Sequence, residues 1–142
     1  MNRMEMAGHL IRRLQQQSNQ VFQTQTHAAG FDFTSVQFAA LDAIAQQPHI
    51  DQATLAVAIG FDRATIGGVI DRMEGKGLVQ RKVSQLDRRA KLLSLTAKGQ
   101  QLLSASRPVV EALQQDILQP LSPTERTQFL DLARKALGGQ GR

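Results

Sequence analysis

The amino-acid sequence predicts a mainly α-helical protein with a small β-hairpin. Apolar residues recur every three or four positions along most of its 142 residues, which is the period of amphipathic helices. Residues that cap helices precede several of these segments, and glycine or proline follows them. Two short β-prone runs, 78–83 and 91–95, flank a polar stretch and predict the hairpin.

The N-terminal third of the chain predicts two helices. Residues 5–27 form an amphipathic segment that should end near Gly30. Thr34 and Gln37 have the spacing of a capping box, so a second helix is expected to begin there and to end at residues 46–48. Its apolar stripe is expected to be Leu41, Ile44 and Ala45.

Two shorter helices are expected next. Asp51 would cap a helix over residues 52–59, and Asp62 would cap another that runs to Lys76. Gly60 lies between them, where a helix often ends in a left-handed residue. The hairpin follows directly.

The C-terminal part predicts two further helices. Thr96 would cap a long helix from Ala97, which Pro108 should kink or break into two. The run Ser122-Pro123-Thr124-Glu125 signals the start of the last helix, because it combines a capping box with proline at the first helical position. Residues 138–142 are expected to fray.

All of the net charge lies in one stretch. Between Gly60 and Lys98 there are nine basic and four acidic residues, which accounts for the formal net charge of +5, because the remainder carries eight of each. A concentrated basic segment is the footprint of a polyanionic partner. Phe61 is its only aromatic residue, whereas proteins that hold single strands usually stack bases on aromatic rings. The segment therefore predicts double-stranded nucleic acid as the partner.

Several function classes are disfavoured by composition. The chain has no cysteine, so disulfides, thiolate catalysis and thiol redox switches are not available. His9, His27 and His49 lack metal-ligand spacing, and we find no nucleophile–base pairing or phosphate loop. We therefore expect no metal, no cofactor and no enzymatic activity. No apolar run is long enough to cross a membrane, which leaves the cytoplasm as the expected location.

Residues 52–76 have the form of a helix-turn-helix. One face of its second helix is apolar and should pack inward, with Ile66, Val69, Ile70 and Met73. The opposite face presents Gly67 and Gly68, flanked by Thr65 and Arg72, and a major groove accepts a helix presented in this way. Each glycine costs about 1 kcal/mol relative to alanine. The pair either lets the backbone lie close to DNA, which we favour, or marks a tight helix–helix contact.

The basic hairpin directly after this helix pair makes a winged helix the predicted architecture. Arg88 and Arg89 stand at its tip, where they would enter a minor groove, and Lys82 and Lys91 lie on its two strands. Asp87 would hold the Arg89 guanidinium in a fixed geometry. Helix pairs in bundles and solvated charged loops resemble each half of this motif, but the combination favours DNA binding.

The sequence resembles the MarR family of transcriptional regulators over residues 33–100. The resemblance is carried by Thr34-x-x-Gln37, Leu55-Ala56-x-x-Ile59-Gly60, Asp62-x-x-Thr65, Asp71-Arg72-Met73-Glu74-x-Lys76-Gly77-Leu78-Val79-x-Arg81, Asp87-Arg88-Arg89 and Leu95-Thr96-x-x-Gly99. The Asp-Arg-Arg wing followed by Leu-Thr-x-x-Gly is the most specific of these motifs.

This resemblance implies a winged-helix homodimer whose first and last helices intertwine. Residues 1–32 and 97–142 would form the dimerisation region, and residues 33–96 would form the DNA-binding lobe. Each lobe would place a recognition helix in the major groove of a pseudo-palindromic operator.

The resemblance also assigns roles by position. The family's recognition helix corresponds here to a segment that contains Arg63, Thr65, Gly67, Gly68 and Arg72. Arg89 falls on the family's minor-groove wing arginine, and Asp87 falls on its orienting aspartate. The two glycines depart from the Thr, Ser or Arg of many members. Because of this departure, we expect direct base readout to contribute less to recognition, and the wing, the backbone contacts and DNA shape to contribute more.

Many proteins of this kind are repressors released by a small ligand, often aromatic and anionic, that binds between the dimerisation helices and the lobe. In this chain His9, Arg12 and Arg13 are the candidate anion partners, because arginine grips a carboxylate with two hydrogen bonds. Phe31 and Phe38 are candidates for an apolar wall. A solvated face or an inter-subunit ion pair would also explain the cations, and each phenylalanine is more often simple core.

The leading hypothesis is a sequence-specific, ligand-responsive DNA-binding repressor. A non-specific architectural DNA-binding protein is the alternative, and a winged-helix module that binds an acidic protein is a third. The residue pattern does not encode the operator, the regulated genes or the effector, and it leaves open whether binding represses or activates.

Overall fold

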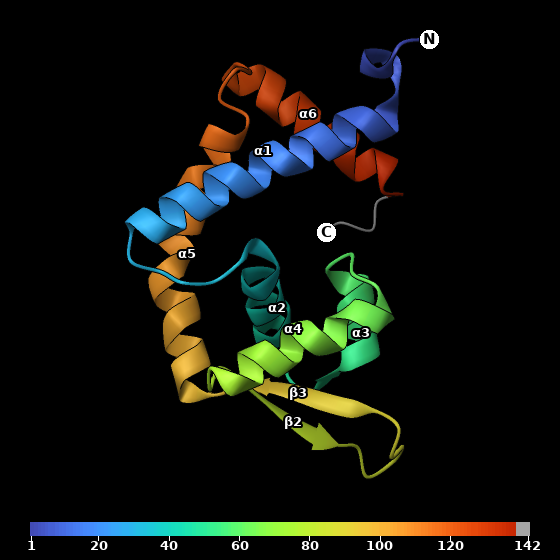
Figure 1. The fold of residues 1–142 in the computed structure, drawn as a ribbon, viewed down its shortest axis with the longest axis vertical. Helices are drawn as coiled ribbons and strands as arrows, with labels where there is room; N and C mark the ends of the chain where they lie inside the picture. Colours follow the sequence, from blue (N-terminus) through green and yellow to red (C-terminus); the bar gives the residue numbers. More distant parts are fainter. Residues whose placement is uncertain (139–142) are drawn as a thin grey trace.

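Residues 1–138, the part of the chain that this computed structural model describes, form six α-helices and one antiparallel sheet (Figure 1). The helices are α1 (Ala7–Ala28, after a 3-10 turn at Arg3–Glu5), α2 (Ser35–Gln46), α3 (Gln52–Ala58), α4 (Arg63–Gly75), α5 (Ala97–Ile117) and α6 (Pro123–Ala136). The strands are β1 (Ile50–Asp51), β2 (Val79–Val83) and β3 (Lys91–Leu95). The mainly helical fold with a small hairpin wing is confirmed, and the predicted fraying beyond Gly138 lies outside the described residues.

Local hydrogen bonds explain why the predicted helix starts are right. The Thr34 hydroxyl accepts from the backbone N–H of Gln37 at 3.1 Å, and the Gln37 side chain accepts from the Thr34 N–H at 3.2 Å. The same reciprocal pair begins α6, where Ser122 and Glu125 exchange contacts of 2.8 and 3.2 Å. Each capping box satisfies backbone donors that a helix start leaves free.

Three details of the sequence prediction are wrong, and one of the two alternatives expected at Pro108 is excluded. Ala45 is exposed, so the buried stripe of α2 does not include it. Asp62 occupies the cap position of α4, but among residues 1–138 its carboxylate makes no cap hydrogen bond. Pro108 lies inside α5 without breaking it into two helices. Strand β1 was not expected, because two residues are too short to show an alternating pattern; it pairs with β3, in the order β1-β3-β2.

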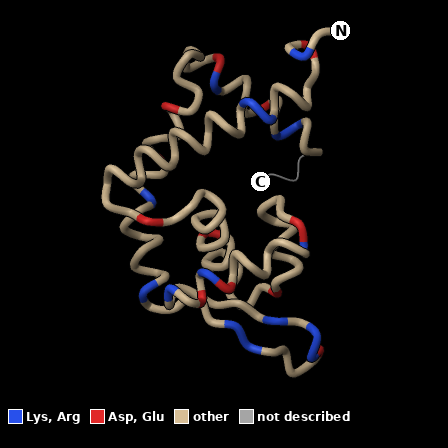
Figure 2. The backbone as a smooth tube through the Cα atoms, in the orientation of Figure 1, with Lys and Arg blue, Asp and Glu red and all other residues tan. Residues whose placement is uncertain are grey.

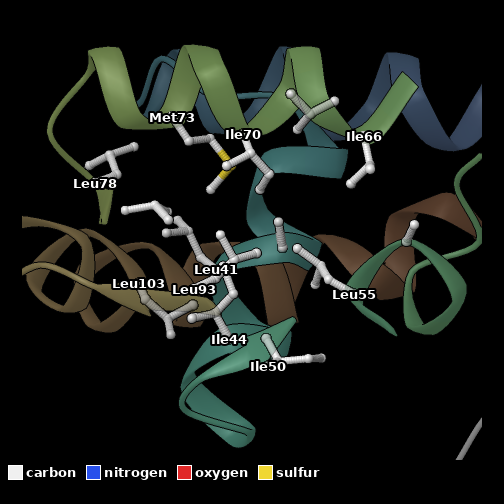
Figure 3. Close-up of a cluster of buried hydrophobic side chains, with 14 residues drawn as sticks. Leu41, Ile44, Ile50, Leu55, Ile66, Ile70, Met73, Leu78, Leu93 and Leu103 are labelled. Atoms are coloured by element: carbon white, nitrogen blue, oxygen red, sulfur yellow. The ribbon is translucent and has the colours of Figure 1, made fainter. Parts of the chain in front are cut away.

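The main core lies between α2, α3, α4 and the sheet (Figure 3). Leu41 and Ile44 from α2 meet Ile70 of α4 and Leu93 of β3 there, each at most 1% exposed. Leu103 of α5 also packs into this core, so the proposed boundary between lobe and dimerisation region at residue 96 stays a prediction. A second cluster joins α1 to α5 through Phe22, Phe33, Val110 and Leu113.

The junction between the wing and α5 shows why Leu-Thr-x-x-Gly is needed. The Thr96 hydroxyl accepts from the N–H of Gly99 at 3.0 Å and donates to the carbonyl of Gly77 at 2.6 Å. A Cβ on Gly99 would clash with the carbonyl oxygen of Leu78. Glycine is therefore required for the first turn of α5 to lie against the start of the wing.

No single described helix is long and apolar enough to cross a membrane. Only α3 and α4 taken together reach the required apolar length, and they are bent by 105° relative to each other.

Asp51→Ala should lower the free energy of unfolding by about 1 kcal/mol, the usual cost of a lost helix cap. The Asp51 carboxylate accepts from the backbone N–H and the hydroxyl of Thr54, which lowers the pKa of Asp51. A lowered pKa means that this contribution is complete at neutral pH and disappears as the pH falls below about 4. Urea unfolding at neutral and acidic pH measures both effects.

Asp62→Ala is the matched control, because Asp62 holds the same position on α4 without a cap hydrogen bond in the described chain. It should cost less than Asp51→Ala at neutral pH. Equal losses for the two variants would contradict the assignment.

Candidate nucleic-acid interface

Helices α3 and α4 form the predicted helix-turn-helix. They meet at 105° through a turn in which Gly60 has a φ of +72°, a conformation that disfavours a side chain. The backbone N–H of Phe61 reaches back to the carbonyl of Ala56 at 2.8 Å, which closes the end of α3. The turn sets the direction in which α4 leaves α3.

Helix α4 buries the face that the sequence predicts. Ile66, Val69, Ile70 and Met73 are 1%, 7%, 0% and 0% exposed, and Figure 3 shows Ile66, Ile70 and Met73 pointing from α4 into the core. The opposite side carries the exposed residues Arg63, Ala64, Thr65, Asp71 and Arg72. The Thr65 hydroxyl donates to the carbonyl of Asp62 at 3.1 Å, inside the first turn.

Gly67 and Gly68 lie on α4 without tight packing around them. A Cβ at Gly67 would meet the side chain of Gln52 at 3.5 Å, and a Cβ at Gly68 would meet only the guanidinium of Arg72, at 3.8 Å or more. Both distances are ordinary van der Waals contacts. The alternative of a tight helix–helix contact therefore does not explain the glycines.

Arg81 fixes the wing to the helix-turn-helix. Its guanidinium pairs with Asp71 and, at 3.4 Å, with Glu74 of α4, and it donates to the side chain of Gln52 on α3 at 3.3 Å. The Arg81 side chain is only 13% exposed, so this network is shielded on the arginine side. The sequence shows Arg81 only as part of a motif, because its partners lie up to 29 residues away.

The tip of the wing is an ordered turn. The Ser84 hydroxyl accepts from the backbone N–H groups of Leu86 and Asp87, both at 3.2 Å. The Asp87 carboxylate accepts from the backbone N–H of Arg89 at 3.0 Å and contacts its guanidinium at 3.4 Å. The Arg89 side chain is 94% exposed, so Asp87 steers a solvent-facing cation. Arg88 is exposed beside it.

A cleft of about 580 Å³ lies between the start of α3, the start of α4 and the wing. Three predicted contact residues, Arg63, Arg89 and Lys91, line it together with Asp51 and Asp87. Figure 2 shows the basic positions gathered along the wing next to these helices. Lys82 pairs with Leu92 in the ladder and, one residue from Arg81, lies on the other face of the hairpin.

A second hollow of about 550 Å³ lies between α1, the α1–α2 loop and α4. Four aromatic residues from these elements and the helix turn contribute to its wall: Phe22, Phe31, Phe33 and Phe61. Within residues 1–138 its lysine and arginine side chains are Arg72 and Lys76, both from α4. Lys76 is not among the ligand residues that the sequence predicts. Its Nζ donates to the carbonyl of Asp32, 44 residues away in sequence.

Of the residues proposed for the ligand, Phe31 lines this hollow and the other four lie outside it. His9, Arg12 and Arg13 are on the N-terminal half of α1 and do not line it. The Nε2 atom of His9 is buried without a hydrogen-bond partner among residues 1–138. Phe38 packs against Phe22 and Phe33 in the second core cluster, and Arg107 lies over its ring. The ligand role of these four residues stays a prediction.

Comparison with known proteins identifies the family. The sequence profile of the MarR family matches residues 33–91. The transcriptional regulator HosA of Escherichia coli is 34% identical over 131 residues, which cover 92% of this chain and 94% of HosA.

Solved structures agree with this result. PcaV of Streptomyces coelicolor, a transcriptional regulator in complex with its natural ligand, has a TM-score of 0.85 at 32% identity, covering 97% of this chain and 96% of PcaV. BpsR of Bordetella bronchiseptica, whose DNA binding is regulated by 6-hydroxynicotinic acid, has a TM-score of 0.83 at 32% identity, covering 93% of each chain. The chain therefore belongs to the MarR family of transcriptional regulators.

Proposed function

We propose that this protein is a sequence-specific, homodimeric DNA-binding repressor that a small aromatic anion releases from its operator. The observation that carries the proposal is the cleft where α3, α4 and the wing converge, since it gathers Arg63, Arg89 and Lys91 beside an exposed helix face. Arginine and lysine bind phosphate oxygens and fix the orientation of a protein on a duplex.

In this proposal α4 enters the major groove and the wing enters the adjacent minor groove. The apolar face of α4 is occupied by the core, so only the side with Arg63, Thr65 and Arg72 is available to the bases and phosphates of DNA. Arg88 and Arg89 extend from the wing tip, where the ordered turn around Ser84 presents them. Lys91 and Lys82 add positive charge on the two strands of the hairpin.

Gly67 and Gly68 support a close approach of the α4 backbone to DNA. Neither is required by packing within the described chain, although each costs about 1 kcal/mol of stability relative to alanine. Because the glycines lower stability and have no packing role among the described residues, they indicate contact with an external partner. Readout at these two positions would then come from backbone proximity and DNA shape.

A second copy of the chain is the proposed partner of α6 and the start of α1. Within residues 1–138 none of the side chains of α6 is buried, and Leu130, Leu132 and Leu137 are 45%, 65% and 65% exposed. The N-terminal segment also exposes apolar side chains, Met4, Met6 and Ile11. Figure 1 shows α6 and the start of α1 at the end opposite the wing, so pairing there leaves both winged lobes free.

The hollow beside α4 is the proposed effector site. Its phenylalanines suit an aromatic ring, and Arg72 and Lys76 suit a carboxylate. The ligand-bound PcaV supports a small-molecule effector, and the 6-hydroxynicotinic acid response of BpsR supports an aromatic acid as its class.

Fluorescence anisotropy with duplex DNA from the region upstream of the protein's own gene tests the main proposal. At physiological salt the affinity should exceed that for a random duplex by a factor of about 10³ or more. Arg89→Ala should weaken binding and reduce the salt slope by about 1 for each wing. Arg107→Ala, on α5 away from both the wing and the proposed dimer contact, is the control and should leave the slope unchanged. Equal affinity for both duplexes would favour the architectural alternative.

Gly68→Ala separates the effect of this glycine on stability from its effect on DNA binding. It should raise the free energy of unfolding by about 1 kcal/mol, because alanine is the better helix former and its Cβ has room in this chain. It should at the same time lower operator affinity, because the methyl group occupies the space that DNA uses. Thermal unfolding measures the change in stability, and anisotropy measures the change in operator affinity. Unchanged affinity in the stabilised variant would argue against a close approach of the α4 backbone to DNA.

Leu132→Glu tests the dimer. A buried charge without a partner is costly, so this variant should shift the protein toward monomer in analytical ultracentrifugation and lose operator affinity. Val57→Glu is the matched control for assembly, because Val57 is also exposed and helical but lies on α3. A dimeric Leu132→Glu variant would rule out α6 as the interface.

A further inference from the structure

The effector hollow and the DNA-facing side of α4 share one side chain, Arg72. Arg72 lines the hollow together with the end of α1 and the α1–α2 loop. Its guanidinium nitrogens also lie 3.8 and 4.0 Å from the position that a Cβ on Gly68 would take. Gly68 belongs to the face that the proposed function gives to DNA. One guanidinium therefore borders both binding surfaces.

Lys76, the other basic residue of the hollow, is already held by the protein. Its Nζ donates to the carbonyl of Asp32 at 3.0 Å and to the side chain of Gln37 at 3.4 Å. Those bonds connect the end of α4 to the loop and to the capping box of α2. Lys76 can add positive charge to the hollow, but moving it would break contacts of the fold.

The Arg72 side chain donates no such hydrogen bonds within residues 1–138. The arginine side chains that donate hydrogen bonds within residues 1–138 are Arg81, Arg89, Arg107, Arg126 and Arg134. Arg72 is not among them, and it is exposed. Its guanidinium donors therefore face solvent, where an external anion can replace water.

We infer that Arg72 is the residue through which effector and operator compete. The inference rests on the proposed function, and it names how that site is regulated. With the operator bound, the Arg72 guanidinium holds a DNA phosphate; with an aromatic acid in the hollow, it holds the carboxylate. One guanidinium fork presents one planar set of donors, so it cannot grip both anions at once. The effector then lowers the affinity for the operator, and the operator lowers the affinity for the effector by the same factor, as thermodynamic linkage requires.

The absence of a side chain at Gly68 is part of this arrangement. The guanidinium of Arg72 lies where a longer side chain at position 68 would project. A side chain longer than alanine at position 68 would therefore compete with the Arg72 guanidinium for this space.

The test uses the full-length protein, its operator duplex, and 6-hydroxynicotinate and benzoate as probe acids. Calorimetry measures acid binding to the free protein, and anisotropy measures operator affinity with and without saturating acid. For the wild type, saturating acid should weaken operator binding at least tenfold. For Arg72→Gln, acid affinity should fall at least tenfold, and saturating acid should no longer change operator affinity. Arg72→Lys, which keeps the charge but loses the fork, should be intermediate.

Arg63→Gln is the matched control, because Arg63 is also exposed on α4 but lines the cleft beside the wing and not the hollow. It should weaken operator binding. Its affinity for the acids, and the factor by which saturating acid lowers operator affinity, should stay as in the wild type. The neutral amide of 6-hydroxynicotinate should bind weakly and should not release DNA.

Two results are distinguishable. If the acids bind the wild type and release DNA, but Arg72→Gln responds equally, the competition through Arg72 is overturned while the proposed function stands. If the wild type binds its operator and none of the acids, the effector part of the proposed function fails, and this inference fails with it.

Discussion

The burial of one face of α4 is the constraint on which the rest of this structure depends. Ile66, Ile70 and Met73 are at most 1% exposed, and burying a side chain of this size contributes about 1.5–3 kcal/mol. Because these residues lie one helical turn apart, they fix the rotation of α4 about its own axis. The rotation in turn decides which residues face outward. DNA contact, if it uses α4, is therefore determined by the core on the other side of the same helix.

The C-terminal half of α4 and its cap residue are tied to the wing, to the loop after α1 and to the start of α5. Arg81 holds α4 to the wing through Asp71, while Lys76 holds it to the loop after α1. Lys98, in the first turn of α5, donates to the carbonyl of Lys76 at 2.8 Å. A displacement of α4 would change all three contacts together. Such an element is suited to transmit a change at the hollow to the wing, because packed elements shift between discrete arrangements.

The interface also separates affinity from selectivity. Exposed cations at the wing and in the cleft act on any phosphate backbone, so they support binding to all sequences. The part of α4 that faces outward is poor in side chains that form paired hydrogen bonds with bases, because Gly67 and Gly68 occupy its middle. In the proposed interface, selectivity would depend on Arg63 and Thr65, on DNA shape, and on the spacing that a dimer would set.

Features that depend on residues close together in the chain could be predicted from the sequence. The helix starts at Thr34, Asp51 and Ser122 rest on hydrogen bonds to residues three positions away. The buried face of α4 follows from the helical period, and the wing follows from two β-prone runs around a polar turn. These features are local, so composition and spacing were enough. The resemblance to the MarR family over residues 33–100 rested on the same local motifs.

Tertiary structure alone decided the features that join distant residues. Strand β1 exists because Ile50 meets Leu93 across the sheet, and two residues carry no periodic signal of their own. The hollow beside α4 joins α1 to α4 and brings His27, Arg72 and Lys76 together, a grouping that their sequence positions do not indicate. Side-chain type and spacing determined the elements and the outward face of α4. Which charges share a cavity was decided by packing between segments that the chain brings together only when it folds.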